Sequence, residues 1–273
     1  MDKLDKLKQI IGANKSAVVA FSGGVDSTFL ARIAGEALPG KVLLVTAMSS
    51  TYPATELDES RRLAALLKLP QRTIISEELD IDGFADNTPQ RCYYCKKTLF
   101  SHILKIARDE GYETVFDGSN IDDRNDYRPG RKATKELGVR SPLFEAGLTK
   151  NEIRDYSKKL SLPTAAKPSL ACLASRFPYG EKITREKLGR VGMAEEALRS
   201  LGFSQLRVRS HGDCARVELM TSEMDAGWVR RSAIQAACKK AGFTFVAIDT
   251  QGYRTGAMNE TLERNTNEKN FDR

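Results

Sequence analysis

Two short stretches of the sequence carry residue types that can do chemistry. The first, residues 88–100, reads TPQRCYYCKKTLF and places Cys92 and Cys95 three residues apart. Such a pair can be a dithiol redox couple, part of a metal site, or buried packing. The second, residues 22–27, reads SGGVDS. Its glycines permit close backbone approach, and the N–H groups of such a turn can bind an anion.

The SGGVDS stretch predicts a phosphate-binding loop. Its serines add hydroxyl donors, and an aspartate beside a phosphate is suited to hold Mg²⁺. The pattern is neither the Walker A motif nor the Rossmann fingerprint. A plain glycine turn before a capped helix is the alternative, since Asp and Ser are common in a first helical turn. Because the complete hexapeptide follows a buried strand, we favour the loop, with the binding residues Ser22, Gly23, Gly24, Asp26 and Ser27.

Composition limits the class of protein. The chain has 273 residues and a net charge of +7, which indicates either an anionic partner or simply a solvated basic surface. No apolar run approaches the ~18 residues of a membrane span, and the opening residues lack the features of a signal peptide. Five cysteines, an odd number, do not indicate a disulfide framework. We therefore expect a cytoplasmic protein with reduced thiols and no membrane contact.

Strand and helix patterns alternate in the first half of the chain. This alternation predicts an α/β fold with a doubly wound parallel sheet, in a domain spanning residues 1–155. Ligands of such sheets bind at the carboxyl ends of the strands, where SGGVDS falls. The expected strands are 17–21, 41–48, 71–76 and 113–120, and the expected helices between them are 26–38, 54–69 and 95–111.

A second, smaller α+β domain is expected over residues 168–260. Residues 149–163 and 184–203 have helical patterns, and residues 205–220 read as a two-stranded hairpin turning at His-Gly-Asp. Arg207 and Arg209 alternate on its first strand and therefore share a face. A helix at 232–243 and a strand at 244–250 follow. Residues 261–273 are polar and read as a flexible tail.

The hexapeptide resembles the PP-loop of N-type ATP pyrophosphatases. Three further stretches narrow the resemblance: NTPQRCYYCKK at 87–97, DGSNIDDRNDYRPGRKATKELGVRSPL at 117–143, and SRFPYG at 175–180. From about residue 5 to about 260, the chain resembles the LarE family of ATP-dependent sulfurtransferases. The resemblance implies a pyridinium-3,5-biscarboxylic acid mononucleotide as substrate, made into a thiocarboxylate for the nickel-pincer nucleotide cofactor. ATP would adenylate the substrate carboxylate, and a sulfur nucleophile would then displace AMP.

The family has two branches that differ in the source of sulfur. In one, the protein sacrifices a cysteine four residues before the serine of SRFPYG, but Ala171 stands there in this sequence. The resemblance therefore implies the other branch, in which Cys92, Cys95 and Cys172 hold a [4Fe–4S] cluster. That cluster would be resupplied by sulfide or by a cysteine desulfurase. From the cysteines alone, zinc or a free dithiol stays open.

The resemblance also assigns residues on the substrate side. Ser175 and Arg176 would bind the substrate phosphate, with Arg207 and Arg209 as further candidates. Glu195 and Glu218 would hold a divalent cation. Asp122, Asp126 and Arg128, after the fourth strand, would contact the nucleotide. The resemblance implies a homo-oligomer. We do not expect a nucleic-acid partner, although a tRNA thiolation enzyme and a non-catalytic nucleotide- or cluster-binding protein are the alternatives.

Overall fold

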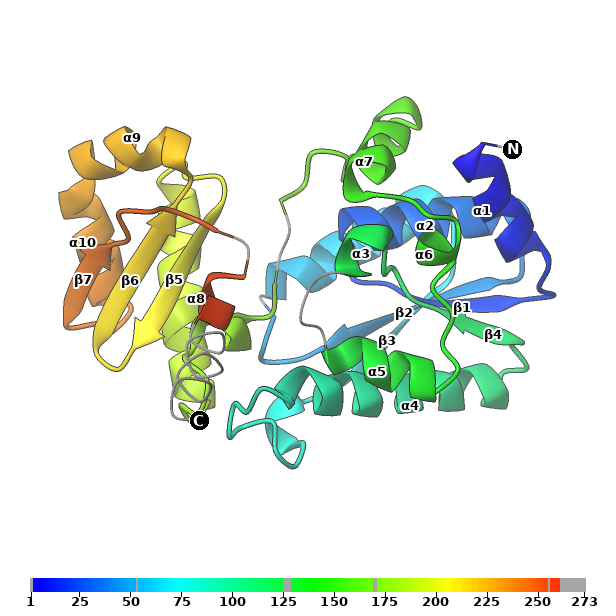
Figure 1. The fold of residues 1–273 in the computed structure, drawn as a ribbon, viewed down its shortest axis with the longest axis horizontal. Helices are drawn as coiled ribbons and strands as arrows, with labels where there is room; N and C mark the ends of the chain where they lie inside the picture. The colour runs from blue at the N-terminus through cyan, green and yellow to red at the C-terminus, as the bar shows by residue number, and fades with distance from the viewer. Residues whose placement is uncertain (1, 53, 125–128, 169–170, 255, 261–273) are drawn as a thin grey trace, which may run out of the picture. The chain divides into compact units, whose positions relative to one another are not determined.

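The computed structural model describes residues 2–260 except 53, 125–128, 169–170 and 255. Its contacts divide the chain into two compact units, labelled element by element in Figure 1. Unit 1 comprises Met1–Phe84 and Pro89–Leu170, and unit 2 comprises Ala85–Thr88 and Ala171–Arg273. The tail that we predicted at 261–273 lies outside the described residues.

Unit 1 is built on a four-stranded sheet whose strands are all parallel. This confirms the predicted α/β class. The first strand of the chain lies inside the sheet, and later strands are added on both sides of it. The strands in spatial order are β3 (Gln71–Ile75), β2 (Val42–Met48), β1 (Ala17–Ala20) and β4 (Thr114–Phe116).

Helices cover both faces of this sheet, as a doubly wound fold requires. Alternate residues of β1 point to opposite faces: Val19 belongs to the core cluster that includes Phe29 of α2, and Val18 to the one that includes Phe100 of α4. Figure 1 shows α1 and α2 on one side of the strands and α4 and α5 on the other. The helices are α1 (Lys3–Gly12), α2 (Val25–Ala37), α3 (Ala54–Leu67), α4 (Arg91–Asp109), α5 (Pro129–Glu136), α6 (Pro142–Glu145) and α7 (Lys150–Lys159).

Helix α4 begins at Arg91, four residues before the start that the sequence predicted. The apolar spacing that we used begins only at Phe100 and continues through Ile103 and Ala107, the residues that face the core. Before Phe100 the only buried residue of this helix is Arg91, so its first turns gave no apolar periodic signal. Cys92 and Cys95 therefore lie on a helix, one turn apart.

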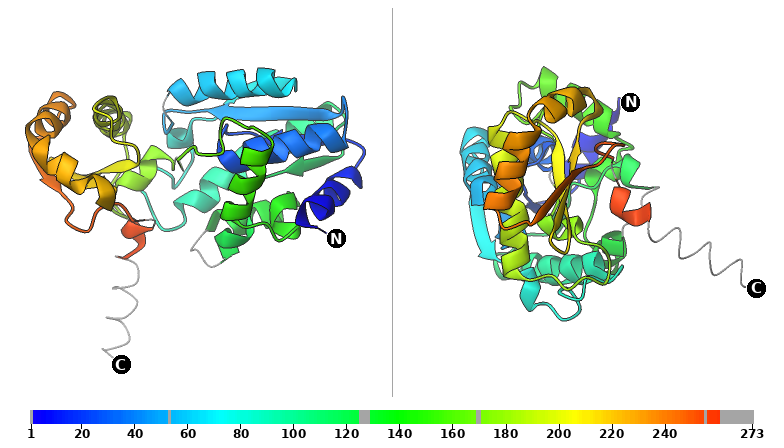
Figure 2. Two further views of the ribbon diagram at one scale, coloured as in Figure 1. Left: turned by 90° about the horizontal axis from the view of Figure 1, so that it is seen from above. Right: turned by 90° about the vertical axis from the view of Figure 1, so that its left-hand side faces the viewer.

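Unit 2 contains a three-stranded sheet with helices packed against it, as Figure 2 shows from two further directions. The predicted hairpin is confirmed: β5 and β6 run antiparallel and turn at Gly212, whose φ is +59°. Strand β7 pairs with β6 in parallel. The elements are α8 (Arg185–Ser200), β5 (Leu206–His211), β6 (Cys214–Leu219), α9 (Met224–Val229), α10 (Arg231–Lys240) and β7 (Phe245–Ile248).

Among the described residues, no helix combines the length and the hydropathy needed to cross a lipid bilayer.

Candidate active site

The SGGVDS loop joins β1 to α2 at the carboxyl end of the central strand. Gly23 adopts φ +69°, and Gly24 precedes the first turn of α2, where its carbonyl oxygen accepts from Thr28 N at 3.0 Å. The Ser22 and Ser27 hydroxyl oxygens lie 3.2 Å apart, and Gly24 N donates to Ser22 Oγ at 3.4 Å. The loop is thus folded on itself at a helix N-terminus, which is an anion-binding arrangement.

Substituting Gly23 with alanine should weaken ATP binding because the residue needs a left-handed backbone conformation. A Cβ at φ +69° costs about 1–2 kcal/mol, and relief of that strain would move the loop. Gly40 provides a matched control, since it has φ +72° with no atom within 4 Å of a Cβ and lies in the turn before β2. We expect both variants to lose similar stability on denaturation, and only G23A to raise the KM for ATP. An equal KM in the two variants would contradict this role for the loop.

Asp26 lies in the first turn of α2, and its carboxylate is largely withdrawn from solvent. It forms an ion pair with Lys150 Nζ from the first turn of α7, and Asn120 Nδ2 lies 3.5 Å from its Oδ1. Burial raises the pKa of the Asp26 carboxyl above its ordinary value of 3.8, an effect that the Lys150 ammonium opposes. A carboxylate held beside a phosphate loop is suited to bind Mg²⁺.

The raised pKa of Asp26 predicts a pH dependence of nucleotide binding. A proton competes with Mg²⁺ for the carboxylate, and it competes at higher pH when the pKa is raised. Affinity for Mg²⁺·ATP should therefore be full well above the raised pKa and fall as the pH drops through it. Titration calorimetry across this range measures the effect, and D26N should lack this component of the pH dependence. A pH-independent wild-type affinity would contradict it.

The segment after β4 completes the polar surroundings of the loop. Asp117 accepts from Ser119 Oγ at 2.9 Å and from Ser141 Oγ at 2.6 Å. The next residue, Gly118, lies so close to α2 that an added Cβ would be 3.3 Å from Ser27 N. The predicted nucleotide contact Asp122 accepts from Lys150 N at 2.8 Å, at the start of α7. Its predicted partners Asp126 and Arg128 lie outside the described residues.

Sequence reasoning missed two lysines that the fold brings to the loop. Lys150 follows the helix cap Thr149, whose capping box was visible in the sequence, but nothing there indicated a contact with Asp26. Lys167 Nζ donates to Gly23 O at 3.3 Å. Neither lysine belongs to a local motif, so only the fold could assign it to the site.

The predicted cluster ligands are divided between the two units. Cys92 is exposed and Cys95 half-buried in unit 1, whereas Cys172 is half-buried in unit 2, directly before the 3₁₀ turn Leu173–Arg176. None of the five cysteines forms a disulfide, and Arg91 Nη2 lies 3.7 Å from Cys92 Sγ. Over the described residues, no three His, Cys, Asp or Glu side chains form a metal-binding group. Joint ligation by the three thiols remains a prediction.

The other two cysteines, Cys214 and Cys238, belong to unit 2. Cys238 is fully buried, and burial raises the pKa of its thiol to about 11. Cys214 is half-buried. Neither takes part in the site described here.

Arg176, a predicted phosphate ligand, is a buried side chain of unit 2. Its Nε and Nη2 donate to the two oxygens of Glu195 at 2.8 and 2.9 Å, and both side chains are at most 1% exposed. Its Nη1 donates to Ala171 O at 2.7 Å and Cys172 O at 3.0 Å. The guanidinium thus fixes the backbone that carries Cys172. Glu195 also accepts from Val208 N at 3.0 Å.

Arg207 and Arg209 are buried, so neither side chain lies on a solvated edge of the sheet. Arg209 makes a bidentate pair with Glu218 at 3.0 and 2.8 Å, and its Nη1 donates to Ser175 O at 2.9 Å. Arg207 lies over the Tyr253 ring at 5.1 Å. Burial, with repulsion from Arg176, lowers the pKa of the Arg207 guanidinium to about 10. It therefore remains charged at neutral pH.

Five predicted substrate-side residues are thus joined by hydrogen bonds within unit 2. They are Ser175, Arg176, Glu195, Arg209 and Glu218. In this arrangement both glutamates are engaged by arginines. Their predicted role as ligands of a divalent cation remains untested.

No family model matches the sequence. Individual proteins do match it along most of its length. An uncharacterised protein of Synechocystis is 40% identical over 264 residues, which is 96% of this chain and 98% of that protein. The pyridinium-3,5-bisthiocarboxylic acid mononucleotide synthase of Lactiplantibacillus plantarum is 38% identical over 247 residues, 90% of each chain. The chain belongs to the LarE-like family of PP-loop ATP pyrophosphatases.

Membership of the LarE-like family makes the chain a homologue of an ATP-dependent sulfur-inserting enzyme. The parallel sheet and the SGGVDS loop are those expected of a PP-loop enzyme. A more distant match links the chain to a tRNA-specific 2-thiouridylase of Brucella ovis. It is 28% identical over 208 residues, 62% of this chain and 52% of that protein.

Proposed function

We propose that this enzyme uses ATP to adenylate a carboxylate of pyridinium-3,5-biscarboxylic acid mononucleotide and converts it to a thiocarboxylate, a step in making the nickel-pincer nucleotide cofactor. The observation that carries the proposal is the 38% identity, over 90% of each chain, to a synthase of the bisthiocarboxylic acid mononucleotide. The PP-loop of unit 1 supports binding of ATP, and the buried arginines of unit 2 support binding of an anionic substrate.

In unit 1, the loop residues have the geometry to hold the pyrophosphate of ATP. The Gly24 N–H and the hydroxyls of Ser22 and Ser27 are the anion donors. Asp26, a half-buried carboxylate paired with Lys150, fits Mg²⁺ as an oxygen ligand. Lys150 would then be free to move from Asp26 toward a phosphate oxygen. Stabilising the charge that develops on pyrophosphate is what drives transfer of AMP to the carboxylate.

In unit 2, the arginines fit a phosphate monoester. Arg176 and Arg209 both donate to Ser175, Arg207 lies on the same strand as Arg209, and bidentate guanidinium donors match phosphate geometry. We assign this cluster to the substrate phosphate. We retain Glu195 and Glu218 as candidate ligands of a divalent cation. Binding of the cation would require each glutamate to leave its arginine partner.

The thiols fit an iron–sulfur cluster in part. Cys92 and Cys95 lie one turn apart on α4, a spacing at which two side chains share a helix face, and thiolates are the usual ligands of such clusters. With Cys172 as a third ligand, the cluster would supply sulfur from an iron that lacks a protein ligand. Sulfide or a cysteine desulfurase would replenish it, in an assembly of several copies of the chain.

Anaerobic purification tests the proposal directly. The protein is assayed for iron and acid-labile sulfide, then incubated with ATP and the pyridinium dicarboxylate mononucleotide, and thiocarboxylate is detected by mass spectrometry. We expect product, AMP and pyrophosphate, with loss of product on C172A and on C92A, and normal product on the matched control C214A. Full activity of C172A would remove that thiol from the reaction. Loss of one sulfur from the protein mass would instead indicate self-sacrifice.

A tRNA thiolation enzyme is the second candidate, because one surface of unit 1 is strongly basic. Besides the buried Arg91, helices α4 and α5 carry seven lysine and arginine residues against two acidic ones. Lys97 and Lys132 both lie within 6 Å of the Tyr93 ring, at 5.6 and 5.9 Å. RNA bound to this surface would show affinity that falls steeply with salt. Filter binding of unmodified tRNA, with K97E/K132E as the variant, decides between the candidates.

A further inference from the structure

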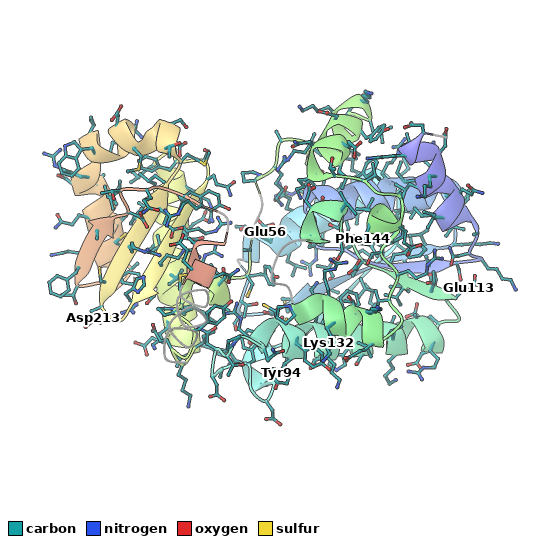
Figure 3. The ribbon with its side chains drawn as sticks, viewed as in Figure 1. Glu56, Tyr94, Glu113, Lys132, Phe144 and Asp213 are labelled. Atoms are coloured by element: carbon teal, nitrogen blue, oxygen red, sulfur yellow. The ribbon has the colours of Figure 1, made fainter. Side chains whose placement is uncertain are left out.

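Lys167 is a half-buried cation that contacts the phosphate loop directly. Its ammonium, with a side chain 11% exposed, donates to Gly23 O at 3.3 Å, to Glu56 Oε2 at 2.9 Å and to Glu59 Oε2 at 2.7 Å. Glu56, labelled in Figure 3, and Glu59 lie on the first turns of α3. One lysine thus connects the loop, α3 and the segment after α7.

The backbone on both sides of Lys167 is held in place. Arg154 of α7 donates from Nη1 to Ala165 O at 2.6 Å and from Nη2 to Lys167 O at 2.8 Å. Lys167 N donates to Thr164 O at 2.9 Å, which closes a turn. A long side chain anchored in this way delivers its ammonium to a fixed position, which surface lysines do not.

The contact with Gly23 O determines the direction of an anion-binding donor. The peptide between Gly23 and Gly24 is planar, so its carbonyl oxygen and its N–H point in opposite directions. With the oxygen on Lys167, the Gly24 N–H points the other way, toward Ser22 Oγ at 3.4 Å. Because both flanking residues are glycines, rotation of this peptide has little steric hindrance. A rotated peptide would present an oxygen to the phosphate in place of an N–H.

We propose that Lys167 is a positioning residue that locks the Gly23–Gly24 peptide in the orientation that binds the pyrophosphate portion of ATP. The proposal rests on the ATP-binding half of the proposed function and is independent of its sulfur chemistry. Lys167 also balances the charges of Glu56 and Glu59, which would otherwise repel an anion at the loop.

The test compares binding of inorganic pyrophosphate and of Mg²⁺·ATP by titration calorimetry. K167M should weaken both by about tenfold to a hundredfold, as expected for loss of one charge-assisted hydrogen bond. K167R should recover most of the affinity, because arginine keeps the charge and the donors. K158M is the matched control, since Lys158 is an exposed lysine of α7 that pairs with Asp155, and it should bind as the wild type does.

A triple variant separates peptide locking from simple charge balance. In K167M/E56Q/E59Q the two carboxylates are neutral, so restored wild-type affinity would mean that Lys167 acts only by neutralising them, and this would overturn the proposal. We expect the triple variant to remain weakened. In turnover assays K167M should raise the KM for ATP and leave that for the mononucleotide unchanged, a split that general structural damage would not give.

Failure of this inference can be told from failure of the proposed function. If the wild type binds neither pyrophosphate nor ATP, the nucleotide site itself is wrongly assigned. If the wild type binds both and K167M binds them equally well, only the role of Lys167 is wrong.

Discussion

Replacing Asp26 with asparagine should reduce ATP-dependent pyrophosphate release by about 10²-fold or more, the usual cost of removing one group that stabilises transition-state charge. The amide keeps the size of the carboxylate but loses the charge that attracts Mg²⁺. Pyrophosphate release is measured with the mononucleotide present, over a range of Mg²⁺ concentrations. If Asp26 binds the metal, excess Mg²⁺ should restore part of the rate.

Two comparisons keep this result specific. D109N removes an exposed carboxylate of α4 that pairs with Lys105, and it should leave the rate unchanged. K150M removes the cation that faces Asp26 but keeps the metal ligand, so it should retain Mg²⁺-dependent turnover within about tenfold of the wild type. If K150M were as inactive as D26N, the ion pair rather than the metal would be the important feature.

Replacing Glu195 with glutamine should destabilise unit 2 by about 3–5 kcal/mol, because the buried Arg176 would lose its bidentate partner. Arg199 Nη2, at 2.9 Å from the same carboxylate, would lose a second contact. Urea denaturation followed by fluorescence measures the effect in this unit, since the single tryptophan of the chain, Trp228, lies on α9.

The neighbouring residue provides the control for this stability prediction. Glu196 is 58% exposed at its side chain and lies 3.8 Å from Arg199, so E196Q should change the free energy of unfolding by less than about 1 kcal/mol. Equal stability of the two variants would contradict a structural role for the buried pair. Loss of stability in E195Q would also place Glu195 among the residues that hold the Cys172 segment through Arg176.

The sequence was sufficient to predict the elements whose patterns are local. The apolar runs of β1 and β2 are buried on both faces of the sheet, so they stand out as continuous apolar segments. The helix that begins after Thr149 and the His-Gly-Asp turn also depend on short-range interactions, and both are found where they were expected. Helices α5 and α6 were missed because α5 is largely polar and α6 is a single turn after Ser141.

By itself, then, the sequence determined the α/β class, the SGGVDS loop and the resemblance that the relatives bear out, because each depends on residues close together in the chain. Only the tertiary structure decided which residues, distant in the sequence, contact that loop. Lys150 and Lys167 reach Asp26 and Gly23 across more than a hundred residues, and Arg207 and Arg209 are internal charges rather than surface ones. Such contacts follow from the packing of helices on the sheet, which no local pattern records.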